Sequence, residues 1–175
     1  HMDLTKKLFP KLDELIKTIE KKAESVKGTI KTGRTHLMDA MPIDFAEELI
    51  AWSSQLQSSK DMLCILEKKF LELPQGGTAV GSGINAHKQF AKYFAQEMTK
   101  LAGNKYKCVP SKNFYHELSA QDCSVQLSGE LKNLAVILMK ISNDLRWMNS
   151  GPLAGLSEIE LKALQPGSSI MPGKV

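Results

Sequence analysis

The segment from Ser119 to Met148 constrains the fold of this chain more than any other stretch of its sequence. Ser119 and Asp122 have the spacing of a helix capping box, so we expect a long helix that begins there and ends near Met148. Its apolar residues fall on nearly every side of the helix axis. Such a helix belongs in the centre of a bundle or in an oligomer core, because a surface helix needs a polar face. The apolar positions are Val125, Leu127, Leu131, Leu134, Val136, Ile137, Leu138, Ile141 and Leu145.

Three further segments show helical periodicity. Apolar residues spaced by three and four from Leu8 to Ile30 predict an amphipathic helix that ends near residues 28–33. A second helix is expected after Pro42, with Asp44 as its N-cap, and it should stop before Pro74. A third is expected over residues 87–102, closed by a glycine. No segment alternates in the manner of a strand, so the predicted fold class is all-α, a bundle of long helices.

Composition excludes several classes of protein. The net charge is only +4, and the lysines of the first helix alternate with acidic residues, which disfavours nucleic acid as a partner. The longest apolar run, residues 134–139, is far shorter than a membrane span. Three cysteines without a CxxC pair, and four histidines without zinc spacing, indicate reduced thiols in a cytosol-like compartment and no metal site.

Three connecting segments are longer than a compact bundle needs. They cover residues 32–41, 74–86 and 150–175, whereas loops in bundles usually take about 2 to 8 residues. They combine glycine with Thr, Ser, Asn and Lys, the residue types whose amides and hydroxyls can surround an anion. Residues 81–86 match the dinucleotide fingerprint GxGxxA formally. We reject that interpretation because no buried strand precedes it, and the P-loop spacing is absent too.

Individual candidates carry little weight by themselves. Taken alone, His36 in "GRTHLMDAMP" fits an ordinary polar loop residue better than a catalytic one. The neighbouring Arg34 and Thr35, and the other two anion-binding loops, favour a catalytic role for it. His87 and His116 lack such neighbours and are interpreted as structural or exposed.

Together the three loops resemble the signature regions of the fumarase/aspartase superfamily, and class II fumarases in particular. The stretches are "GRTHLMDAMP", "LPQGGTAVGSGIN" and "SGPLAGLSEIELKALQPGSSIMPGKV", and "LMKISNDLRWMNSGP" fits as well. His36 favours a fumarase, because aspartases typically carry glutamine at that position. The resemblance implies a central helical bundle that pairs with those of other subunits in a homotetramer, each active site drawing loops from three chains.

The implied reaction is the reversible hydration of fumarate to L-malate without metal or organic cofactor. By the resemblance, Ser168 is the base that removes the carbon-bound proton, and His36 handles the proton of the water or hydroxyl. The resemblance also gives the substrate-binding residues, which are Thr35, Ser169, Lys174, Val175, Asn85 and Thr78. Nucleic acid and membrane are not expected as partners, and the expected location is the cytoplasm, or the mitochondrial matrix if the source is eukaryotic.

The expected domain organisation is that of an excised piece. Residues 1–2 are interpreted as a cloning scar, residues 3–149 as part of the central helical bundle, and residues 150–175 as a truncated catalytic signature loop. We expect this piece alone to be inactive and self-associating. The alternatives are another lyase of the superfamily, acting on aspartate, argininosuccinate or adenylosuccinate, or a non-catalytic helical assembly module.

Overall fold

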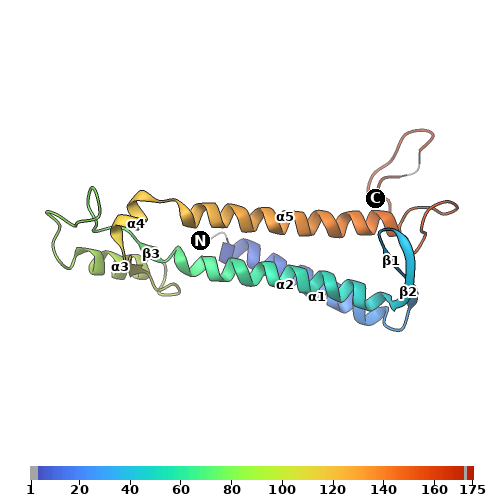
Figure 1. The fold of residues 1–175 in the computed structure, drawn as a ribbon, viewed down its shortest axis with the longest axis horizontal. Helices are drawn as coiled ribbons and strands as arrows, with labels where there is room; N and C mark the ends of the chain where they lie inside the picture. The colour runs from blue at the N-terminus through green and yellow to red at the C-terminus, as the bar shows by residue number, and fades with distance from the viewer. Residues whose placement is uncertain (1–3, 172) are drawn as a thin grey trace. The chain divides into compact units, whose positions relative to one another are not determined.

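The computed structural model describes residues 4–171 and 173–175, so His1 and Met2 lie outside the described residues. Most of the described chain is helical, which confirms the predicted fold class, and Figure 1 shows the elements. In chain order they are the π-helical turn η1 (Leu4–Leu8), α1 (Phe9–Ser25), β1 (Ile30–Thr35), β2 (Met38–Asp44), α2 (Phe45–Lys69), β3 (Glu72–Leu73), α3 (Phe90–Leu101), β4 (Val109–Pro110), α4 (Phe114–Ser119) and α5 (Asp122–Met148).

The chain divides into two compact units. The first unit comprises the chain up to Asp13 together with residues 58–132, and the second comprises residues 14–57 and 133–175. Helices α1, α2 and α5 therefore each contribute one part to either unit. The candidate residues divide between them as well.

The first unit has a small apolar core and a minimal sheet. Strands β3 and β4 pair in parallel, Glu72 with Val109 and Leu73 with Pro110. An ion pair between Lys60 and Asp13 joins the second part of α2 to the start of α1. The buried apolar residues of this unit are Leu4, Phe9, Leu12, Leu63, Leu66, Ala95 and Tyr106.

The second unit packs parts of α1, α2 and α5 together, with the β1–β2 hairpin beside the end of α5 (Figure 1). The ammonium group of Lys140 on α5 lies 5.8 Å from the ring centroid of Trp52 on α2. Its buried apolar residues are Ile16, Ala23, Ala46, Leu49, Trp52, Leu56, Leu134, Ile141 and Met148.

Asp44 caps α2, as the sequence predicted. Its Oδ1 accepts a hydrogen bond from the backbone N–H of Ala46 at 2.9 Å. Its Oδ2 accepts another from the N–H of Gly28 at 2.8 Å, which ties the end of α1 to the start of α2. These two backbone bonds lower the pKa of the Asp44 carboxyl below its ordinary value.

Two expectations of local structure were wrong. Residues 32–41, expected as a connecting loop, instead lie in an antiparallel hairpin that covers residues 30–44. The strands escaped the search for alternation because nearly all of their side chains are at least partly exposed on both faces. Ser119 does not cap α5, because it ends the separate helix α4, and its hydroxyl donates to the carbonyl of Tyr115 at 2.7 Å. The expected end of α5 at Met148 is confirmed.

Candidate active site

The tip of the β1–β2 hairpin carries Thr35 and His36. Thr35 pairs with Met38, so His36 and Leu37 form a two-residue turn, and both have positive φ, 50° and 63°. This is the pattern of a type I′ turn, which normally uses glycine or asparagine. Both Thr35 and His36 are exposed, and within residues 4–171 and 173–175 no hydrogen bond occupies the His36 ring.

The predicted signature loop is closed by a short antiparallel bridge between Gln165 and Lys174. The N–H of Lys174 donates to the carbonyl of Gln165 at 2.8 Å, and the N–H of Leu164 donates to the carbonyl of Lys174 at 2.7 Å. Ser168 and Ser169 lie exposed inside this closed loop, while Lys174 and Val175 lie at its base. The Ser168 hydroxyl accepts a long hydrogen bond, 3.4 Å, from the N–H of Ile170.

The segment leading into that loop folds back onto the end of α5. The N–H of Glu158 donates to the carbonyl of Met148 at 2.8 Å. The N–H of Leu161 donates to the side-chain oxygen of Asn149 at 2.7 Å. Residues 156–161 therefore have a fixed position relative to the helix, although they form no helix or strand of their own.

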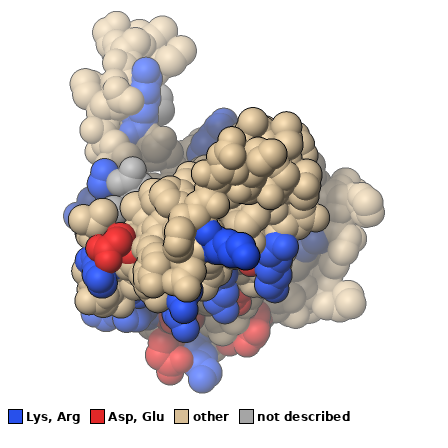
Figure 2. Space-filling view, turned by 90° about the vertical axis from the view of Figure 1, so that its left-hand side faces the viewer, with Lys and Arg blue, Asp and Glu red and all other residues tan. Residues whose placement is uncertain are grey.

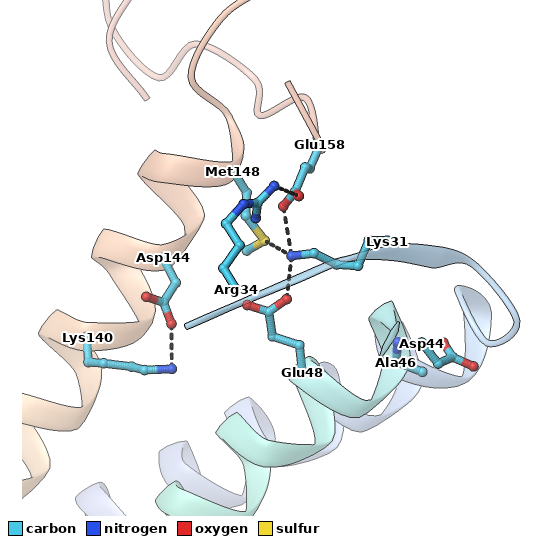
Figure 3. Close-up of polar contacts among 9 residues, drawn as sticks. All are labelled: Lys31, Arg34, Asp44, Ala46, Glu48, Lys140, Asp144, Met148 and Glu158. Carbon is cyan, nitrogen blue, oxygen red and sulfur yellow. Dashed lines mark hydrogen bonds and ion pairs between the residues drawn. The ribbon is translucent and has the colours of Figure 1, made fainter. Parts of the chain in front are cut away.

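A network of charged side chains joins this segment to the hairpin (Figure 3). The Glu158 carboxylate contacts the Lys31 ammonium at 2.7 Å through one oxygen and the Arg34 guanidinium at 2.5 Å through the other. Lys31 also reaches Glu48 on α2 at 2.6 Å and the sulfur of Met148 at 3.7 Å. The network thus links β1, α2, the end of α5 and the segment before the serine loop.

Three members of the network, Lys31, Arg34 and Glu158, have pKa values shifted in the direction that favours their charged forms. Burial lowers the pKa of Lys31, but contacts with Glu158 and Glu48 outweigh burial, and the net pKa is raised. Burial raises the pKa of Glu158, but Arg34 and Lys31 outweigh it, and the net pKa is lowered. The contact with Glu158 raises the pKa of Arg34. Sequence analysis missed Lys31, Glu48 and Glu158, because nothing in the sequence revealed that these charges are largely removed from water.

Thr78 and Asn85 lie in the first unit, in the glycine-rich loop between β3 and α3. Both have positive φ, 57° and 65°. They line a cavity of about 530 Å³ together with Gln75, His87 and Phe90. The cavity offers hydroxyl, amide and imidazole groups above an apolar wall.

The glycines of this loop have a different use from the one expected. The N–H groups of Gly81 and Gly83 donate to the carbonyl of Gly77, at 2.9 and 3.0 Å, and so are not free to bind an anion. A Cβ on Gly81 would lie 2.6 Å from the backbone nitrogen of Tyr115, and one on Gly77 would lie 2.7 Å from Leu118. These glycines let the loop pack closely against α4.

The two other histidines within the described residues, His87 and His116, are accounted for by local contacts. The His116 ring lies 2.7 Å from Asp122, which raises the His116 pKa, and the ring is largely exposed. Nδ1 of His87 accepts from the N–H of Gln89 at 3.2 Å.

The described residues contain no group of His, Cys, Asp and Glu side chains able to hold a metal ion. Over the same residues, no helix is both long enough and apolar enough to span a bilayer. Cys64, Cys108 and Cys123 are free thiols.

The serine loop and the His36 hairpin thus belong to one unit and are joined through Glu158, whereas Thr78 and Asn85 belong to the other unit.

A family model described as "Lyase" matches residues 1–175. The chain is 52% identical over 174 residues to "Fumarate hydratase class II 2" of Pseudomonas aeruginosa, covering 99% of this chain and 38% of that protein. It is 53% identical over 169 residues to "Fumarate hydratase class II" of Xylella fastidiosa, covering 97% of this chain and 35% of that protein.

Similarity extends to solved structures. The crystal structure of a recombinant class II fumarase from Schistosoma mansoni matches with a TM-score of 0.91 and 37% identity, covering 99% of this chain and 39% of that one. This chain therefore spans well under half the length of each of these three relatives.

Proposed function

We propose, because this chain belongs to the lyase family whose model matches it from end to end, that the full-length protein containing it is a class II fumarate hydratase. The observation that carries the proposal is the 52% identity to such an enzyme across 99% of this chain. The presence of the His36 hairpin and the Ser168 loop in one unit supports it. The substrates would be fumarate and L-malate.

The chemical difficulty of this reaction decides what the site must do. A proton beside a carboxylate is very weakly acidic, so its removal from L-malate requires stabilisation of the dianionic aci-carboxylate that forms. We assign Ser168 as the base that takes the proton, and Lys174 as the cation that offsets the charge. Loss of the hydroxyl on the neighbouring carbon, protonated by His36, then gives fumarate and water. In the reverse direction the same two groups exchange roles.

The remaining candidates suit recognition of a dicarboxylate. Hydroxyl and amide donors hold carboxylates without competing for the transferred proton, and Thr35 and Ser169 offer such donors on the two loops of the second unit. Val175 would contribute its backbone beside Lys174. Thr78 and Asn85 face the cavity of the first unit and are assigned the weaker role of lining a substrate site.

Surface charge favours an anionic substrate. Figure 2 looks onto the end of the chain that carries α3 and shows several basic side chains, in blue, spread among uncharged ones, with fewer acidic side chains, in red. Between residues 88 and 112 the sequence contains a single acidic residue, Glu97, and many exposed lysines. A positive field of this kind raises the local concentration of a dianion, in a manner that salt weakens. The lysines are Lys88, Lys92, Lys100, Lys105, Lys107 and Lys112.

Ultraviolet absorbance of fumarate tests the proposal in the full-length protein. We expect malate to be converted to fumarate, and we expect Ser168→Ala and His36→Asn each to lower kcat/KM by about 10² to 10⁴, the usual cost of losing a general acid or base. His116→Asn is the matched control, since its exposed ring contacts only residues of its own neighbourhood. Release of ammonia from aspartate in place of malate turnover would instead identify an aspartase. Activity of both site variants within a few-fold of wild type would favour a non-catalytic assembly module.

Assembly and location follow from the same proposal. We assign the full-length protein as a homotetramer, and the exposed apolar side chains of α5, among them Val125, Met139 and Trp147, support burial against other subunits. The free thiols support a reducing compartment such as the cytoplasm, or the mitochondrial matrix in a eukaryote.

A further inference from the structure

The contacts of the Glu158 side chain are those of a residue that holds other segments of the chain in place. Its carboxylate lies between two cations, and each oxygen serves one of them. The side chains of Glu158 and Lys31 are only 14% and 10% exposed. Charges this far removed from water persist only when paired, so removing the carboxylate would leave two cations with too few partners.

Its two partners lie on the strand that ends at the proposed site. Lys31 and Arg34 belong to β1, and Arg34 immediately precedes Thr35 and His36. In Figure 3 the two cations reach from the strand toward Glu158, with Met148 beside them. Any displacement of Glu158 therefore acts directly on the strand that leads into the hairpin turn.

Glu158 is equally well connected to the serine loop. Its backbone N–H is bonded to the end of α5, and Leu161, three residues on, is bonded to Asn149. The chain then runs without another helix to the bridge between Gln165 and Lys174 that closes the loop holding Ser168. One carboxylate thus has the hairpin on one side and the approach to the serine loop on the other.

We propose that Glu158 is a positioning residue, whose carboxylate, shared by Lys31 and Arg34, holds the His36 hairpin in register with the segment that carries Ser168. Its role in catalysis rests on the proposed function, because Glu158 acts there only by placing the two proton-transfer groups. Glutamine cannot replace it, because an amide presents one acceptor oxygen and turns N–H donors toward a cation. Aspartate is one methylene shorter and cannot reach both cations from the same backbone position.

Kinetics of the full-length protein test the catalytic part, with Glu160→Gln as the matched control because Glu160 is exposed and only two residues away. At a temperature where every variant is folded by circular dichroism, we expect Glu158→Gln and Glu158→Asp to lower kcat by about 10- to 100-fold, since small misplacements of reacting groups cost that much. KM should change much less, because Glu158 touches no substrate. Glu160→Gln should behave as wild type.

A double substitution separates positioning from general destabilisation. If Lys31 acts on catalysis through Glu158, Lys31→Met combined with Glu158→Gln should lower kcat only a few-fold beyond the loss from Glu158→Gln alone. If the double variant instead loses kcat by the product of the two single-variant factors, the proposal is overturned. A kcat of Glu158→Gln within three-fold of wild type would overturn it as well.

Nuclear magnetic resonance spectra of the 175-residue chain test the coupling without reference to activity. We expect Glu158→Gln to shift or broaden the amide signals of Thr35, His36, Ser168 and Ser169, and Glu160→Gln to leave them in place. If the full-length wild-type protein fails to convert malate but these signals of the 175-residue chain respond, the proposed function is wrong and the positioning by Glu158 stands. If Glu158→Gln leaves both loops' signals unchanged, the positioning is refuted whatever the enzyme does.

Discussion

Three of the residues that sequence motifs singled out have a left-handed backbone conformation. His36, Thr78 and Asn85 all have positive φ, a region that non-glycine residues adopt at a cost. Such strain persists only where the surrounding structure maintains it, and it is concentrated at functional sites. The sequence indicated these residues by the chemistry of their side chains and by the motifs in which they stand. It could not indicate their backbone conformation, because glycine is the usual sequence signal of a left-handed position and none of these residues is glycine.

Substitutions at Leu37 measure the backbone strain in the hairpin turn directly. Its φ is 63° and its side chain is 72% exposed, so replacement changes the turn more than the packing. We expect Leu37→Gly to be more stable than Leu37→Val by about 1 to 2 kcal/mol, because valine is disfavoured in the left-handed region. Urea unfolding of the two variants gives the difference. The same substitutions at Leu153, which is exposed and has no positive φ, should differ by less; an equal difference at both sites would contradict the interpretation.

Asp44 should make stability depend on pH. Its folded pKa lies below the unfolded value, so its contribution is present above the unfolded pKa and is lost as the pH falls through the folded pKa. We expect Asp44→Asn to keep the helix cap but reduce the loss of stability between neutral and acidic pH, and Asp44→Ala to lower stability at neutral pH as well. Urea midpoints measured at several pH values, with Asp39→Asn as the exposed control, test this. An unchanged acid dependence in Asp44→Asn would refute it.

At the scale of elements, the long helices could be predicted and the hairpin could not. Periodic apolar residues placed the end of α5 at Met148, and Asp44 marked the start of α2, because packing and capping leave local signals. The hairpin depends on a two-residue turn without glycine and on strands exposed on both faces, so neither turn chemistry nor alternation revealed it. The link from Glu158 to β1 joins residues far apart in sequence, and no local pattern records it.

Two glycines should respond oppositely to the same substitution. A Cβ on Gly33 would lie 2.5 Å from the carbonyl oxygen of Met41 across the hairpin, whereas a Cβ on Gly129 in α5 meets nothing within 4 Å. We expect Gly33→Ala to destabilise the chain by about 1 to 3 kcal/mol through overpacking. Gly129→Ala should stabilise it by about 0.5 to 1 kcal/mol, because alanine favours a helix interior. Thermal unfolding at low protein concentration measures both, and a stabilised Gly33→Ala would show that the hairpin register differs from the one described.

At the scale of the whole molecule, we expect the 175-residue chain to associate with itself. On α5, Val136, Met139 and Trp147 are separated by three and eight residues, which places them on one face of the helix, and they are 48%, 59% and 57% exposed. Burying such a face recovers about 25 cal/mol per Å² of apolar area. Light scattering at micromolar concentration should give a mass above that of one chain. Val136→Glu should lower that mass, whereas Thr18→Glu, an equal change of charge on an exposed position of α1, should not; a monomeric wild type would refute the inference.

The same chain should be catalytically inert, even though it contains both assigned proton-transfer groups. A serine hydroxyl becomes a base only when neighbouring donors or charges stabilise its alkoxide. Among the described residues, the only hydrogen bond to the Ser168 hydroxyl is the 3.4 Å contact from Ile170, and no hydrogen bond orients the His36 ring. Residues of an active site act as a unit, so two unassisted groups supply little of the rate. A malate-to-fumarate assay on the chain should remain at background where the full-length protein turns over, and substantial activity would show that these two loops suffice.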